Sequence, residues 1–299
     1  MNRLNYEKVF KTLVEETRNY LVNHSLRAMV LGVSGGIDST VVAAICCEVN
    51  KQTNIPLIGR SLPIKNKKDE FDVSKLVGEA FCNNFDVANL YDEYKCFLSG
   101  LVWREERIDL LDDTETMHPE KSKQQTLIAN GNIQARLRMI YLYNLASIHN
   151  GLVMSTDNQT EYQLGFWTIH GDVGDFDPIQ DLWKTEVYQL AEWLKLFYYT
   201  DGDDADKAVA IGESIKLTPT DGLGISNSDL DQIGAKSYND VDRVLQTLVC
   251  PASPENDRVQ DALTVEIGPE IIDKIIKRRR NSRFKREKSP IYISRERYE

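Results

Sequence analysis

The stretch of this chain that most constrains its fold is residues 34–39, which read Ser-Gly-Gly-Ile-Asp-Ser. An apolar run, residues 28–33, precedes it and is typical of a buried strand, and a run rich in Val, Ala and Ile follows it at residues 40–49. The pattern predicts a strand, a tight loop and a helix. Glycines let the backbone approach a bulky anion, and free N–H groups at a helix start point toward it. The loop is therefore predicted to hold a phosphate group.

The spacing of the glycines excludes two better-known phosphate loops. A Walker loop requires a Lys directly after its last glycine, and none follows Gly36. A dinucleotide fingerprint requires G-x-G-x-x-G, which Gly32, Gly35 and Gly36 do not form. The remaining alternative is a Gly-Gly turn without a ligand, but such a turn does not require two serines and an aspartate around its glycines.

Hydrophobic periodicity predicts the rest of the fold. Strands are expected at residues 28–33, 55–62, 84–90 and 151–156, and helices at residues 4–23, 40–49, 69–81, 126–149 and 187–197. Strands that alternate with helices predict an α/β fold, a doubly wound parallel sheet of about five strands with ligands at the carboxyl ends of the strands. The weakly patterned residues 91–125, with an acidic run at 109–115, are expected to form a solvated loop.

After residue 201 the pattern becomes mostly helical, with helices expected at residues 205–214, 227–234, 237–249 and 269–280. We expect a single domain over residues 1–299, with a parallel-sheet core at about 25–200 and a helical C-terminal portion at about 201–299. Lys and Arg are dense between residues 274 and 288. This basic stretch either contacts an anionic ligand or is a solvated helix end.

Composition argues against several classes of protein. The formal net charge of −10 argues against general nucleic-acid binding. No apolar stretch is long enough to span a membrane, and the first residues do not resemble a signal peptide, so a cytoplasmic protein is expected. The five cysteines form no C-x-x-C pair, so neither a zinc site nor a redox pair is expected.

Five stretches together resemble a known family. They are GVSGGIDST (32–40), NGNIQARLRM (130–139), STDNQTEYQLGF (155–166), GDVGDFDPIQDLWKTEV (171–187) and RFKRE (283–287). The first alone resembles the pyrophosphate loop of the N-type ATP pyrophosphatases, and the five in order resemble the ammonia-dependent NAD synthetases, whose fold is adenine nucleotide alpha hydrolase-like. The resemblance implies amidation of deamido-NAD (nicotinic acid adenine dinucleotide) to NAD, through an acyl-adenylate, with release of AMP and pyrophosphate.

The resemblance also implies the residues of the site. Mg²⁺ would be held by Asp38 and Glu161, and catalytic roles would fall to Asp172 and Lys184. ATP would be bound by Gly32, Val33, Ser34, Gly35, Gly36, Ile37, Asp38, Ser39, Thr156, Lys184 and Thr220. Deamido-NAD would be bound by Arg136, Arg138, His170, Asp172, Phe284 and Lys285. His170 is included because Ile169 stands where family members usually carry a Lys.

General chemistry fits several of these roles. A positioned carboxylate such as Asp172 could orient ammonium and take its proton, although a Gly-Asp pair also forms simple turns. Mg²⁺ prefers one or two carboxylates with phosphate oxygens and water, but Asp38 could instead cap a helix and Glu161 could lie on the surface. Arg136 and Arg138 are two apart on a helix, do not share a face, and are expected to contact different partners.

The family resemblance implies a homodimer that acts on small molecules. Glutamine-dependent relatives carry an extra hydrolase domain, for which 299 residues leave no room, so free ammonia or a separate protein is expected to supply the nitrogen. Two other functions stay open at this point. One is another ligase with a pyrophosphatase loop, such as a GMP synthetase-like or tRNA-modifying enzyme, and the other is a non-catalytic nucleotide-binding regulator.

Overall fold

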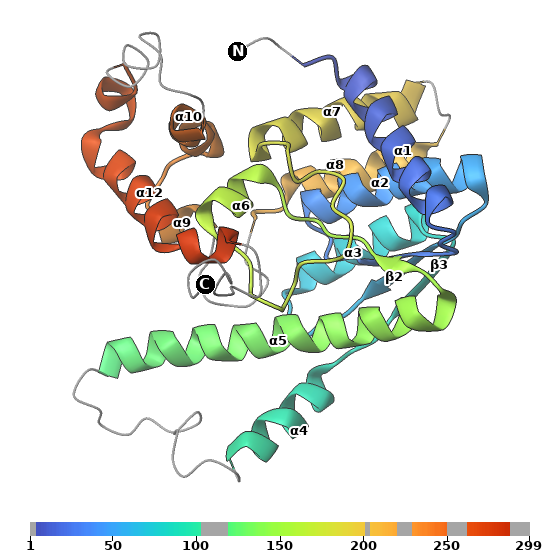
Figure 1. Ribbon diagram of the computed structural model, residues 1–299, viewed down its shortest axis with the longest axis horizontal. Coiled ribbons are helices and arrows are strands. Elements are labelled where there is room, and N and C mark those ends of the chain that lie inside the picture. The colour runs from blue at the N-terminus through green and yellow to red at the C-terminus, as the bar shows by residue number, and fades with distance from the viewer. Residues whose placement is uncertain (1–3, 103–118, 201–203, 220–228, 250–261, 288–299) are drawn as a thin grey trace, which may run out of the picture.

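A parallel β-sheet forms the centre of the structure (Figure 1). The structure is a computed structural model that describes residues 4–102, 119–200, 204–219, 229–249 and 262–287. Within these residues the sheet has four strands in the order β3-β2-β1-β4, all parallel. Their bounds are β1 Met29–Gly32, β2 Leu57–Ser61, β3 Asn84–Val87 and β4 Leu152–Val153. The predicted parallel α/β fold is confirmed.

The described residues form one strand fewer than the five expected. A single parallel bridge between Met154 and Phe176 stands where a further strand would begin. Ser155 N donates to Phe176 O at 2.8 Å, but Pro178 follows two residues later. Because proline has no N–H to donate, it does not extend a ladder in the middle of a sheet. The pairing therefore stops after one bridge.

Side chains of the central strand alternate between two hydrophobic cores. Met29 and Leu31 of β1 face the first core, and Val30 faces the second together with Ile58 of β2. Successive residues of a strand point to opposite faces of the sheet, so both faces of β1 are buried. This explains why the run at residues 28–33 is apolar throughout rather than alternating with polar residues.

In the part of the chain that the structure describes, five helices pack around the first core. Helix α8 contacts α3 and α7, so the sheet core receives a helix from beyond residue 200. In α1, Phe10, Val14 and Leu21 form the buried apolar stripe that its sequence pattern predicts. The bounds are α1 Tyr6–Asn23, α2 Ile37–Thr53, α3 Lys68–Phe81, α7 Lys184–Thr200 and α8 Ala205–Lys216.

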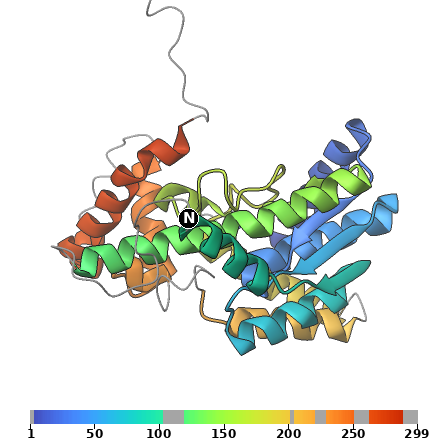
Figure 2. The ribbon, with the colours of Figure 1, turned by 90° about the horizontal axis from the view of Figure 1, so that it is seen from below.

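The second core is covered by α4 Tyr91–Val102 and α5 Pro119–His149. The expectation of a loop at residues 91–125 is wrong for α4, because Leu90, Tyr94 and Leu98 recur every four residues and are buried. It is also wrong at residues 119–125, because α5 begins at Pro119 and not near residue 126. The acidic run at 109–115 lies outside the described residues. Helix α5 is 31 residues long and extends from the sheet toward the C-terminal helices (Figures 1 and 2).

A third hydrophobic cluster lies in the C-terminal portion. Leu164 of α6 is fully buried there with Leu245 and Ile275, so α6 joins the sheet to the last helices. The helices predicted after residue 201 are confirmed to within a few residues as α8 and the later elements. The bounds are α6 Gln159–Leu164, α9 Asp229–Ile233, α10 Tyr238–Val249, α12 Pro269–Asn281 and the 3₁₀ helix η1 Arg283–Arg286. None of the described helices has the length and apolarity of a membrane span.

The strand order reverses between β1 and β4. From β1 the chain continues to β2 and β3 on one side, and it then returns to form β4 on the other side of β1. The connections that leave two such strands diverge and open a crevice at their carboxyl ends, where open α/β sheets bind ligands. The phosphate loop follows β1, and Thr156 to Glu161 follow β4. Both predicted site segments therefore lie at the reversal.

Candidate active site

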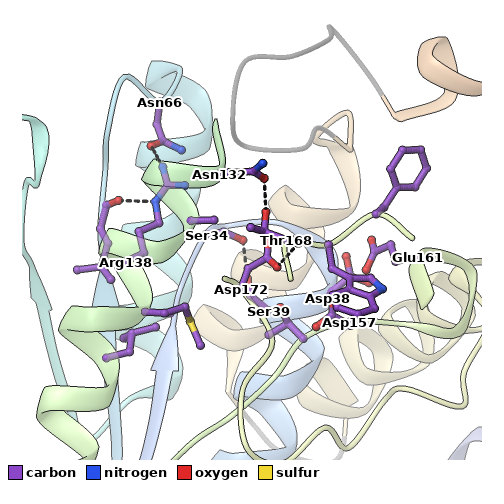
Figure 3. A pocket seen from close by; sticks show the side chains of 18 of the residues that line it. Ser34, Asp38, Ser39, Asn66, Asn132, Arg138, Asp157, Glu161, Thr168 and Asp172 are labelled. Atoms are coloured by element: carbon purple, nitrogen blue, oxygen red, sulfur yellow. Dashed lines mark hydrogen bonds between the residues drawn. The ribbon is translucent and has the colours of Figure 1, made fainter. Parts of the chain in front are cut away.

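A cavity of about 740 Å³ opens at the carboxyl ends of the strands. Its wall combines the loops after β1, β2 and β4 with side chains from α5, α9 and α12. Figure 3 shows Arg138 and Asn66 toward one end, Asp38 and Glu161 toward the other, and Thr168 and Asp172 between them. The cavity thus lies between the sheet and the C-terminal helices.

The loop after β1 has the geometry of an anion cradle. Gly35 has φ +87°, and a Cβ there would lie 2.7 Å from Glu70 O, so only glycine fits without a shift of the backbone. Gly36 occupies the N-cap of α2 and has no side chain with which to cap it. The N–H groups of the first turn are consequently available to an anion.

Hydroxyl groups hold this loop in shape. Ser39 Oγ donates to Gly36 O at 3.0 Å, and Gly36 N donates to Ser34 Oγ at 3.2 Å. From α8, Ser214 Oγ donates to Gly35 O at 2.7 Å and lies 2.8 Å from Thr40 Oγ1. These bonds satisfy the carbonyl groups of Gly35 and Gly36, so the loop has little freedom to collapse.

Two carboxylates from distant segments meet at one ammonium group. Lys184 Nζ, at the first residue of α7, donates to Asp38 Oδ2 at 2.5 Å and to Glu161 Oε1 at 3.0 Å. Only 2% of the Lys184 side chain is exposed. Burial by itself lowers the pKa of Lys184, but Asp38 and Glu161 outweigh this effect and raise it well above its ordinary value. Lys184 is therefore charged at neutral pH.

Asn158 fixes the orientation of both carboxylates. It is fully buried, and its Nδ2 donates to Asp38 Oδ1 at 2.8 Å. As the N-cap of α6, its Oδ1 accepts from Glu161 N at 3.1 Å, and its own N–H donates to Glu161 Oε2 at 3.2 Å. Asn158 thus links the two acids, through its side chain to Asp38 and through its backbone N–H to the carboxylate of Glu161. Because both acids also contact Lys184 Nζ, they are close enough to hold a single cation.

Asp172 and Arg138 belong to a second polar group in the cavity. Asp172 Oδ1 accepts from Thr168 N at 2.7 Å, and Thr168 Oγ1 donates to Asn132 Oδ1 of α5 at 2.8 Å. Burial raises the pKa of Asp172, and the bond from Thr168 offsets part of the rise. Burial also lowers the pKa of Arg138 to about 10, although Asp172 opposes this change.

The two arginines of α5 have different partners, as predicted. Arg138 Nε donates to Leu62 O at 3.0 Å, while an Nη atom of Arg136 donates to Ile169 O at 2.9 Å. Arg138 is part of the cavity wall and Arg136 is not part of it as formed by the described residues. The guanidinium group of Arg136 thus donates a hydrogen bond to the backbone and not into the cavity.

The other predicted residues are divided in the same way. Lys285 lines the cavity, and its Nζ donates to Gly165 O at 2.7 Å and to Trp167 O. Phe284 is 54% exposed, and His170 is also exposed; both lie outside the cavity wall that the described residues form. Thr156 is part of the wall, and Thr220 lies outside the described residues.

Several cavity residues were not predicted from the sequence. Arg60 lies in β2, directly before its final residue, and Asn66 lies in the loop that follows the strand. Proximity to the carboxyl end of a parallel strand is the signal that could have identified both. Asp157 accepts from Ser155 Oγ at 2.8 Å, and burial raises its pKa well above the ordinary value. Other polar residues of the wall come from helices and carry no local signal, among them Gln124, Asn132, Asp231, Gln232 and Arg278.

Known proteins resemble this chain over most of its length. A family model described as NAD synthase matches residues 9–289. The NH(3)-dependent NAD(+) synthetase of Thermoplasma acidophilum is 35% identical over 221 residues, which are 72% of this chain and 75% of that protein. Among solved structures, NMN synthetase from Francisella tularensis has a TM-score of 0.72 at 23% identity and covers 98% of this chain and 100% of its own. The NH3-dependent NAD synthetase of Campylobacter jejuni, in complex with the nitrate ion, has a TM-score of 0.65 at 22% identity, covering 97% and 100%.

Proposed function

Because this chain belongs to the NAD synthase family, we propose that it amidates deamido-NAD with ammonia and cleaves ATP to AMP and pyrophosphate. The observation that carries this proposal is the meeting of Lys184, Asp38 and Glu161 beside the glycine loop, where the strand order reverses. A nucleoside triphosphate needs hydrogen-bond donors and positive charge at the glycine loop, and the acyl group that it activates needs space beside it. The cavity of about 740 Å³ offers both.

The reaction requires an activated carboxyl group. A carboxylate repels a nucleophile through its charge, and its oxygen is a poor leaving group. One oxygen of the nicotinate carboxylate therefore attacks the α-phosphorus of ATP, the bond to the β-phosphate oxygen breaks, and pyrophosphate leaves. Ammonia then attacks the carbonyl carbon of the acyl-adenylate, AMP departs with the former carboxylate oxygen, and one proton is released. The protein contributes positioning and charge stabilisation.

The loop after β1 is the proposed triphosphate site. Its residues 32–39 offer hydroxyl groups and the free N–H groups of the first turn of α2. Lys184 would add a full positive charge beside the leaving pyrophosphate, and Thr156 lies in the adjacent wall. Thr220 stays a prediction from the family resemblance.

Asp38 and Glu161 are proposed to hold Mg²⁺. Their contact with the same Lys184 nitrogen supports this, because the two carboxylates already surround one positive charge. Two carboxylates with phosphate oxygens and water are an ordinary ligand set for Mg²⁺. When bound, the ion would supply charge neutralisation at the departing pyrophosphate.

Arg138, Asp172 and Lys285 are the proposed contacts for deamido-NAD that the cavity supports best. Arg136, His170 and Phe284 stay proposals from the resemblance, and each would have to meet a part of the dinucleotide that extends beyond this cavity. Asp172 is the proposed proton acceptor for ammonium. Its raised pKa fits that role, since a base is most effective when its pKa approaches the working pH.

Three broader proposals accompany the activity. We propose a single domain over residues 1–299, a homodimer in solution and a cytoplasmic location. The homodimer can be checked by light scattering coupled to size-exclusion chromatography, where a mass near the 34.2 kDa of one chain would contradict it.

The test is a coupled assay with deamido-NAD, ATP, Mg²⁺ and ammonium. The expected result is NAD and AMP in equal amounts, lost in Asp38→Asn and retained in Asp181→Asn, whose carboxylate is exposed. Replacing ammonium by glutamine should leave little NAD and little AMP, because AMP departs only when ammonia attacks the acyl-adenylate.

Three other outcomes would contradict the proposal. Nucleotide binding without AMP would indicate a regulator, and AMP formation only with another carboxyl or carbonyl substrate would indicate a different ligase of the same class. Nicotinate mononucleotide is a useful substrate for comparison because it lacks the adenylate half. A clear preference for it over deamido-NAD would overturn the substrate assignment.

A further inference from the structure

A carboxylate from the C-terminal helices lies directly behind the Lys184 site. Asp242 of α10 is 1% exposed. Its Oδ2 accepts from Thr185 N at 2.9 Å, and its Oδ1 accepts from Thr160 Oγ1 at 2.5 Å. Thr160 Oγ1 in turn accepts from Lys184 N at 2.9 Å. Asp242 therefore reaches two segments that are far apart in the sequence, α6 and the start of α7.

These bonds replace a local cap at the start of α7. The first N–H groups of a helix have no partner within it and need an acceptor from elsewhere. At Lys184 and Thr185 the acceptors are Thr160 and Asp242, neither of which lies in the residues directly before the helix. A carboxylate at this end is also favoured by the helix dipole. Since Lys184 is the first residue of α7, the direction of its side chain depends on how this end is held.

Asp242 also supports Glu161, the carboxylate that α6 contributes to the site. Thr160 directly precedes Glu161 in α6, so its bond to Asp242 fixes the turn that carries Glu161. One turn before Asp242 on α10, the centre of the Tyr238 ring lies 5.6 Å from Lys184 Nζ. Helix α10 thus supports Lys184 at its backbone and beside its ammonium group.

We infer that Asp242 is a positioning residue that holds the side chains of Lys184 and Glu161 in the orientation that the phosphates of ATP require. Asp242 accepts hydrogen bonds from Thr160 Oγ1 and Thr185 N, and not from the side chains of Lys184 or Glu161. Asp242 therefore acts on both through Thr160 and the backbone of α7. This inference rests on the proposed function for its assignment of Lys184 and Glu161 to ATP. It adds that the C-terminal helices are part of the ATP-binding apparatus, although most of that apparatus follows the strands.

The test compares Asp242→Asn with Asp273→Asn, an exposed carboxylate on α12. Asparagine keeps the shape but has one acceptor oxygen in place of two, so one of the two segments loses its bond. The readouts are the affinity for α,β-methylene-ATP with Mg²⁺, measured by titration calorimetry, and the KM values for ATP and deamido-NAD. Asp242→Asn should weaken the binding of α,β-methylene-ATP about ten- to a hundredfold. It should also raise KM for ATP more than KM for deamido-NAD. Asp273→Asn should change neither.

A double-mutant cycle separates positioning from general destabilisation. If Asp242 acts through Lys184, Asp242→Asn should weaken the binding of α,β-methylene-ATP much less in the Lys184→Met background than in the native protein. Equal losses in both backgrounds, or equal increases of the two KM values, would overturn the inference. The calorimetric readout does not depend on NAD formation, so the inference can hold even if the proposed substrate is wrong.

A second variant covers the case in which Asp242→Asn does not fold. Thr160→Val keeps the shape of the side chain but removes the hydroxyl group that links Asp242 to Lys184 N. The folded Thr160→Val protein should show the same selective loss of α,β-methylene-ATP affinity. Native affinity in that protein would contradict the inference.

Discussion

Lys184 and Asp38 form an ion pair with 2.5 Å between Nζ and Oδ2, and their side chains are only 2% and 15% exposed. Glu161 shares the same ammonium group at 3.0 Å. One positive charge of the chain itself therefore already compensates part of the negative charge of the two proposed Mg²⁺ ligands. It follows that Lys184 and a metal ion compete for the two carboxylates unless phosphate oxygens draw the lysine away.

Lys184→Met tests this competition. Removing one partner of a buried ion pair leaves uncompensated charge and costs about 3–5 kcal/mol. The two carboxylates should then bind Mg²⁺ without ATP, so Mg²⁺ alone should raise the melting temperature of Lys184→Met more than that of the native protein. The measurement is a thermal melt with and without Mg²⁺. Lys195→Met, on the exposed side of the same helix, serves as control, and an equal response of all three proteins would refute the prediction.

Asn158→Asp tests the link between the two acids. The variant keeps the acceptor for Glu161 N but replaces the donor to Asp38 Oδ1 with an oxygen, so two acidic groups face each other at the present 2.8 Å contact. We expect kcat/KM for ATP to fall about ten- to a hundredfold, with the affinity for deamido-NAD nearly unchanged. The exposed Asn84→Asp on β3 is the matched control for the added charge. Equal losses for both substrates would argue against a role at the phosphates.

Gly35→Ala tests whether the loop after β1 needs its left-handed backbone. At φ +87° an alanine is strained by about 1–2 kcal/mol, and its Cβ would also crowd Glu70 O at 2.7 Å and Ser74 N at 2.8 Å. Lower stability in urea and a large loss of ATP affinity are expected. In Gly100→Ala, where a Cβ would meet nothing within 4 Å, the same change in α4 should stabilise by about 0.5–1 kcal/mol. A Gly35→Ala protein with native ATP affinity would show that the loop adapts.

The sequence predicts the features of this protein that depend on local pattern. The apolar strand runs and the loop at 34–39 identify the parallel sheet and the edge where the cavity opens. Helix α4 was missed because its buried residues Tyr94 and Leu98, with Leu90 just before the helix, are too few to give a clear periodic pattern among the mixed residues around them. Strand content was overestimated because pairing at Phe176 depends on Pro178 and on the path of the whole segment.

Residues that act through tertiary contacts have no such pattern. Asn158 reads as one more polar residue after a strand, and only its burial against Asp38 and Glu161 reveals the link. Asp242 reads as a polar position of an amphipathic helix, and nothing local indicates that it reaches α7. These roles arise when segments far apart in sequence meet, so they require the folded structure.

Asp177→Asn tests a pH dependence of stability. Burial raises the pKa of Asp177 from 3.8 to about 7, although Ile179 N donates to its Oδ1 at 3.1 Å. The folded protein therefore binds this proton more tightly than the unfolded chain. The resulting contribution to stability is present at low pH and is lost as the pH rises through about 7.

Asparagine keeps the acceptor for Ile179 N and has no charge to bury. Between about pH 4 and about pH 8 the free energy of unfolding of the native protein should fall relative to that of Asp177→Asn. Urea unfolding at several pH values measures the difference. A difference that stays constant over this range would mean that Asp177 titrates normally.

Asp172→Asn separates the two half-reactions. Adenylation of the nicotinate carboxylate needs no proton acceptor for ammonium, whereas formation of the amide does. The variant keeps an oxygen that can accept from Thr168 N, now at 2.7 Å from Asp172 Oδ1, so the local turn should persist. Exchange of labelled pyrophosphate into ATP, in the presence of deamido-NAD and without ammonium, should therefore stay close to native. Formation of NAD should fall about 10²- to 10⁴-fold, the usual contribution of a general base.

The pH profile provides the second part of this test. Because burial raises the pKa of Asp172, NAD formation by the native enzyme should increase with pH as this carboxyl group loses its proton. Asp172→Asn should lack that increase. Asp181→Asn changes an exposed carboxylate outside the cavity wall of the described residues, and it should keep both the rate and the profile. If pyrophosphate exchange and NAD formation fall equally in Asp172→Asn, the whole loss arises before amide formation, and the proposed role as proton acceptor for ammonium is contradicted.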